Sequence, residues 1–101
     1  MVTPSDRKRQ KRQALVYVHT VEAILRRWDP IGVRPGEFAP ADEYDSYAPH
    51  IVSMVLGGCT IAQLAQHLTH LRTCVIGVEV NSKRDLRIAI EIVRALRDKA
   101  D

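Results

Sequence analysis

Prolines and glycines crowd into residues 29–45, and this segment most constrains what the chain can fold into. Five of them lie close together, at Pro30, Gly32, Pro35, Gly36 and Pro40. Proline disfavours α geometry in the residue before it, so a helix that precedes the segment must end before Asp29. No hydrophobic period is sustained here, which predicts a long loop. Its aromatic and aliphatic residues, among them Ile31 and Phe38, argue against disorder, so we expect the loop to be ordered.

A hydrophobic period of three to four residues precedes the loop and predicts the first helix. We expect this helix to begin within residues 7–12 and to end at Trp28, with one broad apolar side along its length. The residues on that side are Leu15, Tyr17, Val18, Val21, Ile24, Leu25 and Trp28.

The second helix is predicted to start at Ser46 and to stop at the Gly57-Gly58 pair. With Ser46 as the N-cap, Pro49 is the third helical residue, where its missing N–H removes no helical hydrogen bond. Glycine is common just after the end of a helix, so the glycine pair marks the C-terminus. The apolar face of this helix consists of Tyr47, Ile51, Met54 and Val55.

The third helix is predicted from a capping box, because Thr60 is followed three residues later by Gln63. Its apolar stripe consists of Ile61, Leu64, Ala65, Leu68 and Leu71. Residues 74–81 then alternate weakly in hydrophobicity, like a strand. A single strand would have no partner in this chain, so we expect an extended connection there.

The fourth helix has the clearest pattern, and Ser82 with Asp85 three residues later is an N-cap signature. One apolar stripe contains Leu86, Ala89, Ile90, Val93 and Leu96. A second stripe beside it contains Ile88, Ile92 and Ala95. The two stripes cover more of the circumference than a flanking helix needs. Either this helix is central in the bundle, or the second stripe pairs two copies as a homodimer; the sequence leaves both open.

These patterns predict an all-α fold, a four-helix bundle with a long ordered loop between the first two helices. The 101 residues suit one domain. We divide the chain into residues 1–12, a basic tail or helix start, and residues 13–101, a single helical domain. A content of 46% hydrophobic and 27% charged residues is that of a globular protein. No apolar run reaches the roughly 18 residues of a membrane span, and no signal sequence is evident, so we expect no membrane contact and a cytoplasmic location.

Aromatic and acidic residues concentrate in the loop and just after it, and this stretch is the leading candidate for a binding surface. Aromatic side chains together with carboxylates suit a basic protein partner. Two other roles stay open for the acidic residues: they can cap the second helix and favour the positive end of its dipole, or bind a hard cation. The predicted binding residues are Phe38, Asp42, Glu43, Tyr44, Asp45 and Tyr47.

The basic charge of the chain belongs to its first twelve residues. They hold five basic residues against Asp6, a net charge of +4, so the remaining 89 residues contribute −1 to the total of +3. Such a run neutralises phosphates through counterion release, without reading base sequence. The alternative function is therefore nucleic-acid binding, and the residues that would carry it are Arg7, Lys8, Arg9, Lys11 and Arg12.

No constellation of reactive residues supports an enzyme. His67 and His70 have a spacing that can place two imidazoles on one metal, but no third ligand follows at a suitable spacing on that helix. Cys59 and Cys74 are expected to be free thiols. No nucleophile elbow and no phosphate-binding glycine loop is present. We therefore expect a non-catalytic protein without cofactor or metal, and a metal-dependent enzyme is the third possibility.

Two motifs flank the loop. One is Trp28-Asp29-Pro30-Ile31-Gly32-Val33, at the end of the first helix, and the other is Asp42-Glu43-Tyr44-Asp45-Ser46-Tyr47, at the start of the second. Together they resemble a family of small bacterial helical proteins of unknown function, over roughly residues 20–75. The resemblance implies a compact helical cytoplasmic domain, and some relatives are similar to immunity partners of bacterial toxins. It implies no catalytic residues. Residues 34–41 and the basic N-terminus depart from the family pattern.

Overall fold

The computed structural model describes residues 4–30, 32 and 43–100, and the side chains of residues 12–30, 32 and 43–97. It contains helices α1 (Pro4–Trp28), α2 (Ala48–Leu56), α3 (Ile61–His70) and α4 (Ser82–Ala100). A 3-10 turn over Asp45–Tyr47 leads into α2, and a π-helix over Leu71–Ile76 follows α3. No strand occurs in the described part of the chain, which confirms the predicted all-α class. Most of the predicted loop, residues 31 and 33–42, lies outside the described residues, so its ordered state stays a prediction.

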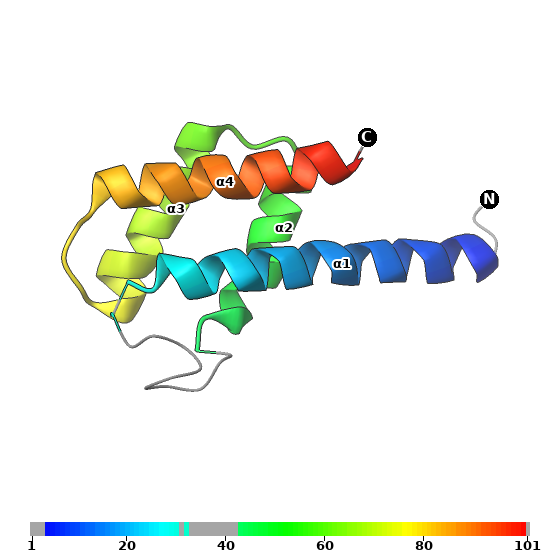
Figure 1. Ribbon diagram of the computed structural model, residues 1–101, viewed down its shortest axis with the longest axis horizontal. Coiled ribbons are helices and arrows are strands. Elements are labelled where there is room, and N and C mark those ends of the chain that lie inside the picture. Colours follow the sequence, from blue (N-terminus) through cyan, green and yellow to red (C-terminus); the bar gives the residue numbers. More distant parts are fainter. Residues whose placement is uncertain (1–3, 31, 33–42, 101) are drawn as a thin grey trace.

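Helices α1 and α4 lie side by side and run in opposite directions, while α2 and α3 cross them (Figure 1). All four helices contribute to one hydrophobic core, and α4 packs against the other three. The large, completely buried apolar side chains include Leu25, Ile51, Leu64, Leu68, Ile92 and Leu96. Of the two alternatives for α4, its packing fits the central position. No helix among the described residues carries a stretch long and apolar enough to cross a membrane.

Most residues of the two apolar stripes predicted on α4 are buried. Ile88 and Ile92 are buried in the core, and Ala95 packs against it, so the residues assigned to a homodimer face the inside of the protomer. Leu86, assigned to the core, is 45% exposed instead. The reason is that the side of α4 facing α2 and α3 is centred on Asp85, Ala89 and Ile92 rather than on Leu86. A homodimer remains untested, but it would not use the second stripe.

The N-terminal part of α1 extends past the rest of the bundle (Figure 1). Leu15, predicted to lie in the core, is 56% exposed, and Val16 is 51% exposed. The hydrophobic period is real, but the bundle is shorter than the helix, so the core begins only at Tyr17. Helix α1 runs without a break from Pro4 through residues 12 and 13, so the backbone of the basic run is helical.

The connection between α2 and α3 has the predicted glycine stop and the predicted capping box. Gly58 has a positive φ of 91°, and the N–H groups of Gly58 and Cys59 donate to carbonyls of the last turn of α2. These two bonds form a Schellman motif, which favours glycine because a Cβ is strained at such a φ. The capping box at the start of α3 is present in both directions: the Thr60 hydroxyl accepts from the Gln63 N–H, and the Gln63 side chain accepts from the Thr60 N–H.

Two predicted N-caps were wrong. Ser46 lies inside the 3-10 turn, and Tyr47, the residue before α2, makes no side-chain capping bond because the backbone is already helical there. Pro49 consequently occupies the first turn of α2. On α4, the capping side chain belongs to Asn81 rather than to Ser82: Asn81 Oδ1 accepts from the Arg84 N–H at 3.2 Å. This displacement by one residue frees Asp85 from a capping role.

The predicted extended connection over residues 74–81 was half wrong. Its first part belongs to the π-helix Leu71–Ile76, and only residues 77–81 are irregular. The Gly77 N–H donates to the carbonyl of Arg72, five residues earlier, and Gly77 ends the π-helix with a φ of 85°. Valine and isoleucine side chains at 75, 76, 78 and 80 produced the strand-like alternation, although they continue a helix for two of these positions. The wide π turns bury the consecutive residues Leu71 and Arg72 together.

Candidate functional site

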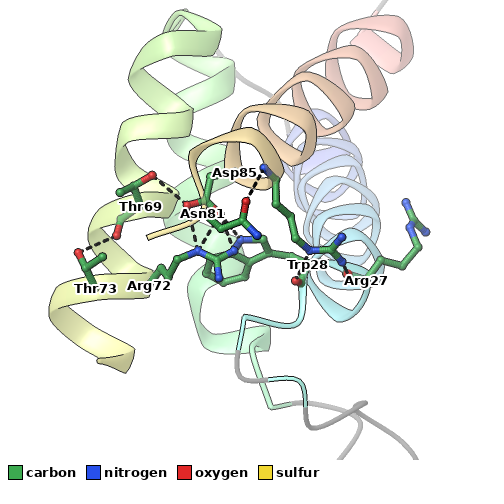
Figure 2. A network of polar contacts seen from close by, with 8 residues as sticks. Arg27, Trp28, Thr69, Arg72, Thr73, Asn81 and Asp85 are labelled. Atoms are coloured by element: carbon green, nitrogen blue, oxygen red, sulfur yellow. Dashed lines mark hydrogen bonds and ion pairs between the residues drawn. The ribbon is translucent and has the colours of Figure 1, made fainter. Parts of the chain in front are cut away.

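A buried ion pair between Asp85 of α4 and Arg72 of the π-helix lies at the centre of the polar contacts (Figure 2). Asp85 is 0% and Arg72 4% exposed. The guanidinium donates from Nη2 to Asp85 Oδ1 at 2.7 Å and from Nε to both carboxylate oxygens at 3.1 Å. This close, multiple contact is the geometry in which arginine binds a carboxylate most strongly.

Two further donors complete the environment of the carboxylate. Trp28, the last residue of α1, donates from its indole Nε1 to Asp85 Oδ1 at 2.8 Å. Thr69, on the last turn of α3, donates from its hydroxyl to Oδ2 at 2.9 Å. The Arg72 guanidinium lies over the Trp28 ring at 5.6 Å from the centroid, a cation–π contact (Figure 2). We call Trp28, Thr69, Arg72 and Asp85 the polar cluster; it joins α1, α3 and α4.

The cluster determines the charge of Asp85. Burial by itself would raise the pKa of this carboxyl, but the hydrogen bonds from Arg72, Trp28 and Thr69, with the charge of Arg72, outweigh burial and lower it. A lowered folded-state pKa means that the carboxylate stabilises the fold above its unfolded pKa of about 3.9 and loses this contribution only as acid protonates it. At neutral pH the ion pair is therefore fully formed.

A second set of contacts fixes the end of α1 beside the cluster. Tyr44 is 1% exposed, packs edge-on against Trp28 with ring centroids 5.8 Å apart, and donates its hydroxyl to Asp29 Oδ1 at 2.7 Å. Arg84 of α4 donates from Nε to the Trp28 carbonyl at 3.0 Å and from Nη2 to the Arg27 carbonyl. The carbonyls left without partners where α1 ends are thus satisfied by a side chain from α4.

The structure divides the predicted binding stretch into buried and exposed parts. Tyr44 is buried, Tyr47 is half-buried, and Glu43 is exposed. Asp45 is half-buried, and its Oδ2 lies 3.7 Å from Arg26 Nη2. Phe38 and Asp42 lie outside the described residues. Of the six predicted residues, Glu43, Asp45 and Tyr47 are those that the described surface offers to a partner.

The predicted basic run is helical, but only one of its side chains is described. Arg12 is exposed on α1. The side chains of Arg7, Lys8, Arg9 and Lys11 lie outside the described set, although their backbone belongs to α1. Their role in nucleic-acid binding stays a prediction.

His67 of α3 lies close to a third histidine, which belongs to another helix and does not follow from the spacing within α3. The rings of His67 and His50, which lies in the first turn of α2, have centroids 5.0 Å apart and are tilted by 57°. Burial lowers the pKa of His67, and the nearby His50 and His70 lower it further. No group of three or more His, Cys, Asp and Glu side chains in the described part of the chain could hold a metal ion.

Both cysteines are free, as predicted. Burial raises the pKa of the Cys59 thiol, and the charge of Arg97 offsets this in part. The Arg97 side chain also binds the backbone next to this thiol: its Nη2 donates to the Cys59 carbonyl at 2.6 Å. A raised thiol pKa disfavours the thiolate that redox or nucleophilic chemistry requires.

The ion pair was not predicted from the sequence, although one signal in the sequence points to it. Asp85 lies four residues before Ala89 and seven before Ile92, both fully buried, so it occupies the core side of α4. A carboxylate on a core face needs a buried cation. The sequence offers Arg72 as this cation, because it directly follows the apolar stripe of α3. Because Asp85 also fits an N-cap pattern, it was predicted to cap the helix rather than to pair with a buried cation.

Comparisons with known proteins add nothing to the geometry. No family model, no curated protein sequence and no solved structure matches the chain. The resemblance noted from the two motifs therefore stays a prediction.

The polar cluster predicts the effect of removing its charge. Asp85→Asn leaves the Arg72 guanidinium buried without a counter-charge, and breaking a buried pair in this way costs about 3–5 kcal/mol. We expect the free energy of unfolding in urea at pH 7 to fall by that amount. Glu79→Gln, at an exposed position, is the matched control and should change stability by less than about 0.5 kcal/mol. A loss below about 1 kcal/mol for Asp85→Asn would show that the cluster is not central to stability.

The lowered pKa of His67 predicts a pH dependence of stability. The folded pKa lies below the unfolded value of about 6.5, so the unfolded chain binds more protons in this range and stability decreases as the pH falls below 6.5. We expect His67→Gln to lose less stability than the parent between pH 7.5 and pH 5.5 in urea unfolding. His19→Gln, on exposed α1 surface, is the control. Equal losses in the parent and the His67 variant contradict the assignment.

Proposed function

We propose that this chain is a non-catalytic nucleic-acid-binding module in which the N-terminal part of α1 is a basic arm. The observation that carries the proposal is the continuity of α1 over 25 residues from Pro4, with an N-terminal part that extends past the bundle (Figure 1). The basic run lies on this part. A helix that leaves the bundle can approach a nucleic acid without obstruction from the other three helices.

Charge complementarity supports a phosphate partner. The whole chain has a pI of about 9.1, and the arm concentrates its basic residues within six positions. Cations brought close to a duplex displace condensed counterions, which makes binding strong at low salt and independent of sequence. Lysine and arginine contacts of this kind position a protein on the backbone and leave base reading to other elements.

The arm makes a quantitative prediction. Each phosphate that the arm neutralises contributes about −0.9 to the slope of log K against log salt. Replacing the five basic residues by glutamine keeps good helix formers in α1 and should reduce the magnitude of that slope by up to about 4.5. The measurement is fluorescence anisotropy with a labelled DNA duplex between 50 and 200 mM salt, and circular dichroism checks that α1 stays helical. An unchanged slope would refute the arm. The five replacements are at Arg7, Lys8, Arg9, Lys11 and Arg12.

A second candidate function is a protein-interaction module, similar to an immunity partner of a toxin, that binds through the exposed remainder of the aromatic–acidic stretch. The observation in its favour is that Glu43 and the half-buried Tyr47 flank Asp45, whose carboxylate is held near Arg26. An aromatic ring and carboxylates on a rigid helix start suit a basic protein surface. Nothing in this arrangement requires Tyr44, which is buried.

This candidate predicts a loss of partner binding without a loss of stability. Glu43→Lys reverses an exposed charge next to Asp45 and should abolish affinity capture of a basic protein partner from a lysate of the native host. Tyr44→Phe is the matched control, because it removes the buried bond to Asp29 at a cost of about 1 kcal/mol but leaves the surface unchanged. Capture that survives Glu43→Lys, or that is lost equally in the control, rules out this surface.

A further inference from the structure

The arginines and lysines of α4 whose side chains are described fall into two groups with different surroundings. Arg84 donates to carbonyls at the end of α1, and Arg97 donates to the Cys59 carbonyl between α2 and α3. Both side chains therefore hold neighbouring elements in place. The other group, Lys83, Arg87 and Arg94, is exposed, and none of its members has a hydrogen bond or ion pair within the described part of the chain.

The second group forms one line along the outside of α4. At 100° per residue, Lys83, Arg87 and Arg94 fall within about 40° of one another around the helix. A rise of about 1.5 Å per residue spaces them by about 6 Å and about 10 Å, so the line is roughly 16 Å long. The core residues Asp85, Ala89 and Ile92 occupy the opposite side. We call Lys83, Arg87 and Arg94 the α4 basic face.

No described carboxylate neutralises this face. Among the acidic residues of α4 whose side chains are described, Glu91 lies nearest to this face, and it is engaged by Arg27 of α1. Asp85 is buried with Arg72. The described carboxylates of α4 thus serve contacts inside the fold, and the three positive charges have no described carboxylate as a partner.

We propose that the α4 basic face binds the phosphate backbone of nucleic acid, as a second contact surface beside the arm of α1. The inference deepens the proposed nucleic-acid function and rests on it for the class of partner. Its own support is separate, because it depends on described side chains that belong to a different helix. A straight line of unpaired cations suits a linear polyanion, in which successive phosphates present one charge after another.

Two other partners are less well matched. An anionic membrane surface would favour apolar side chains between the cations, but Ile90, which lies within the line, is half-buried and only Leu86 at its border is exposed. An acidic protein would gain most from a fully desolvated aromatic anchor at the centre of the interface. The described α4 basic face has no aromatic residue.

The test compares four full-length proteins: the parent, the arm variant with its five glutamines, a face variant, and the combination of both. The face variant carries Lys83→Gln, Arg87→Gln and Arg94→Gln. A charge-matched control carries Ser53→Glu, Ala62→Glu and Gln66→Glu, which lower the net charge by the same three units at exposed positions on α2 and α3. Binding is measured by anisotropy with a 20-base-pair DNA duplex and with an RNA duplex at several salt concentrations.

We expect the face variant to reduce the magnitude of the salt slope by about 2.7, from three phosphate contacts at about 0.9 each. Between 50 and 200 mM salt, the affinity of the parent should then fall about 40-fold further than that of the variant. The control should retain the parent slope. If the control and the face variant behave alike, net charge alone explains binding and the α4 basic face is refuted.

The arm and the face fail in distinguishable ways. A face variant that matches the parent, together with an arm variant that loses binding, overturns the face and leaves the proposed arm standing. The reverse result supports the face and overturns the arm. Phosphatidylserine-containing vesicles and polyglutamate serve as competitor polyanions: displacement of the duplex by either at equal charge concentration overturns the assignment to nucleic acid.

Discussion

The buried pair of Asp85 and Arg72 is the interaction on which the rest of the structure depends. A buried carboxylate is costly unless charge and hydrogen bonds compensate it, and here the compensating groups come from α1, the end of α3 and the π-helix. Each of these elements must therefore lie at one position relative to α4. Apolar packing among the four helices is nondirectional, whereas the hydrogen bonds of the cluster require particular positions of their donors, and we expect this requirement to favour one register of the bundle.

The cluster also explains the motifs at the two ends of the loop. Trp28 donates to Asp85, and Asp29 accepts from Tyr44, whose ring packs against Trp28. The Trp-Asp-Pro motif and the tyrosine of the Asp-Glu-Tyr-Asp motif thus connect the end of α1 to the start of α2. Because these residues act within the fold, the motifs specify how two helices join.

The sequence was sufficient for what depends on local chemistry. Periodicity located the four helices, Pro30 ended the first, and the Thr60–Gln63 capping box and Gly58 placed the α2–α3 connection. It failed where residues distant in the sequence compete for one role. Asp85 matched a capping pattern, but its carboxylate binds the buried guanidinium of Arg72, thirteen residues earlier in the chain. The N-terminus of α4 is capped by the side chain of Asn81 instead. A π-helix widens the turn by one residue and escapes a period of 3.6, which is why residues 74–76 resembled a strand.

Surface side chains, too, differ in whether they are already engaged in contacts within the fold. The aromatic–acidic stretch looked functional because unusual side chains cluster there, yet Trp28 and Tyr44 are buried and Asp45 lies near Arg26. On α4, Arg84 and Arg97 are committed to backbone carbonyls. A charged side chain that already has a partner in the fold gains less from a new one, because binding must first break the existing contact. Charges without internal partners have no such contact to break, and Lys83, Arg87 and Arg94 are therefore better placed for binding than Trp28, Tyr44 or Asp45.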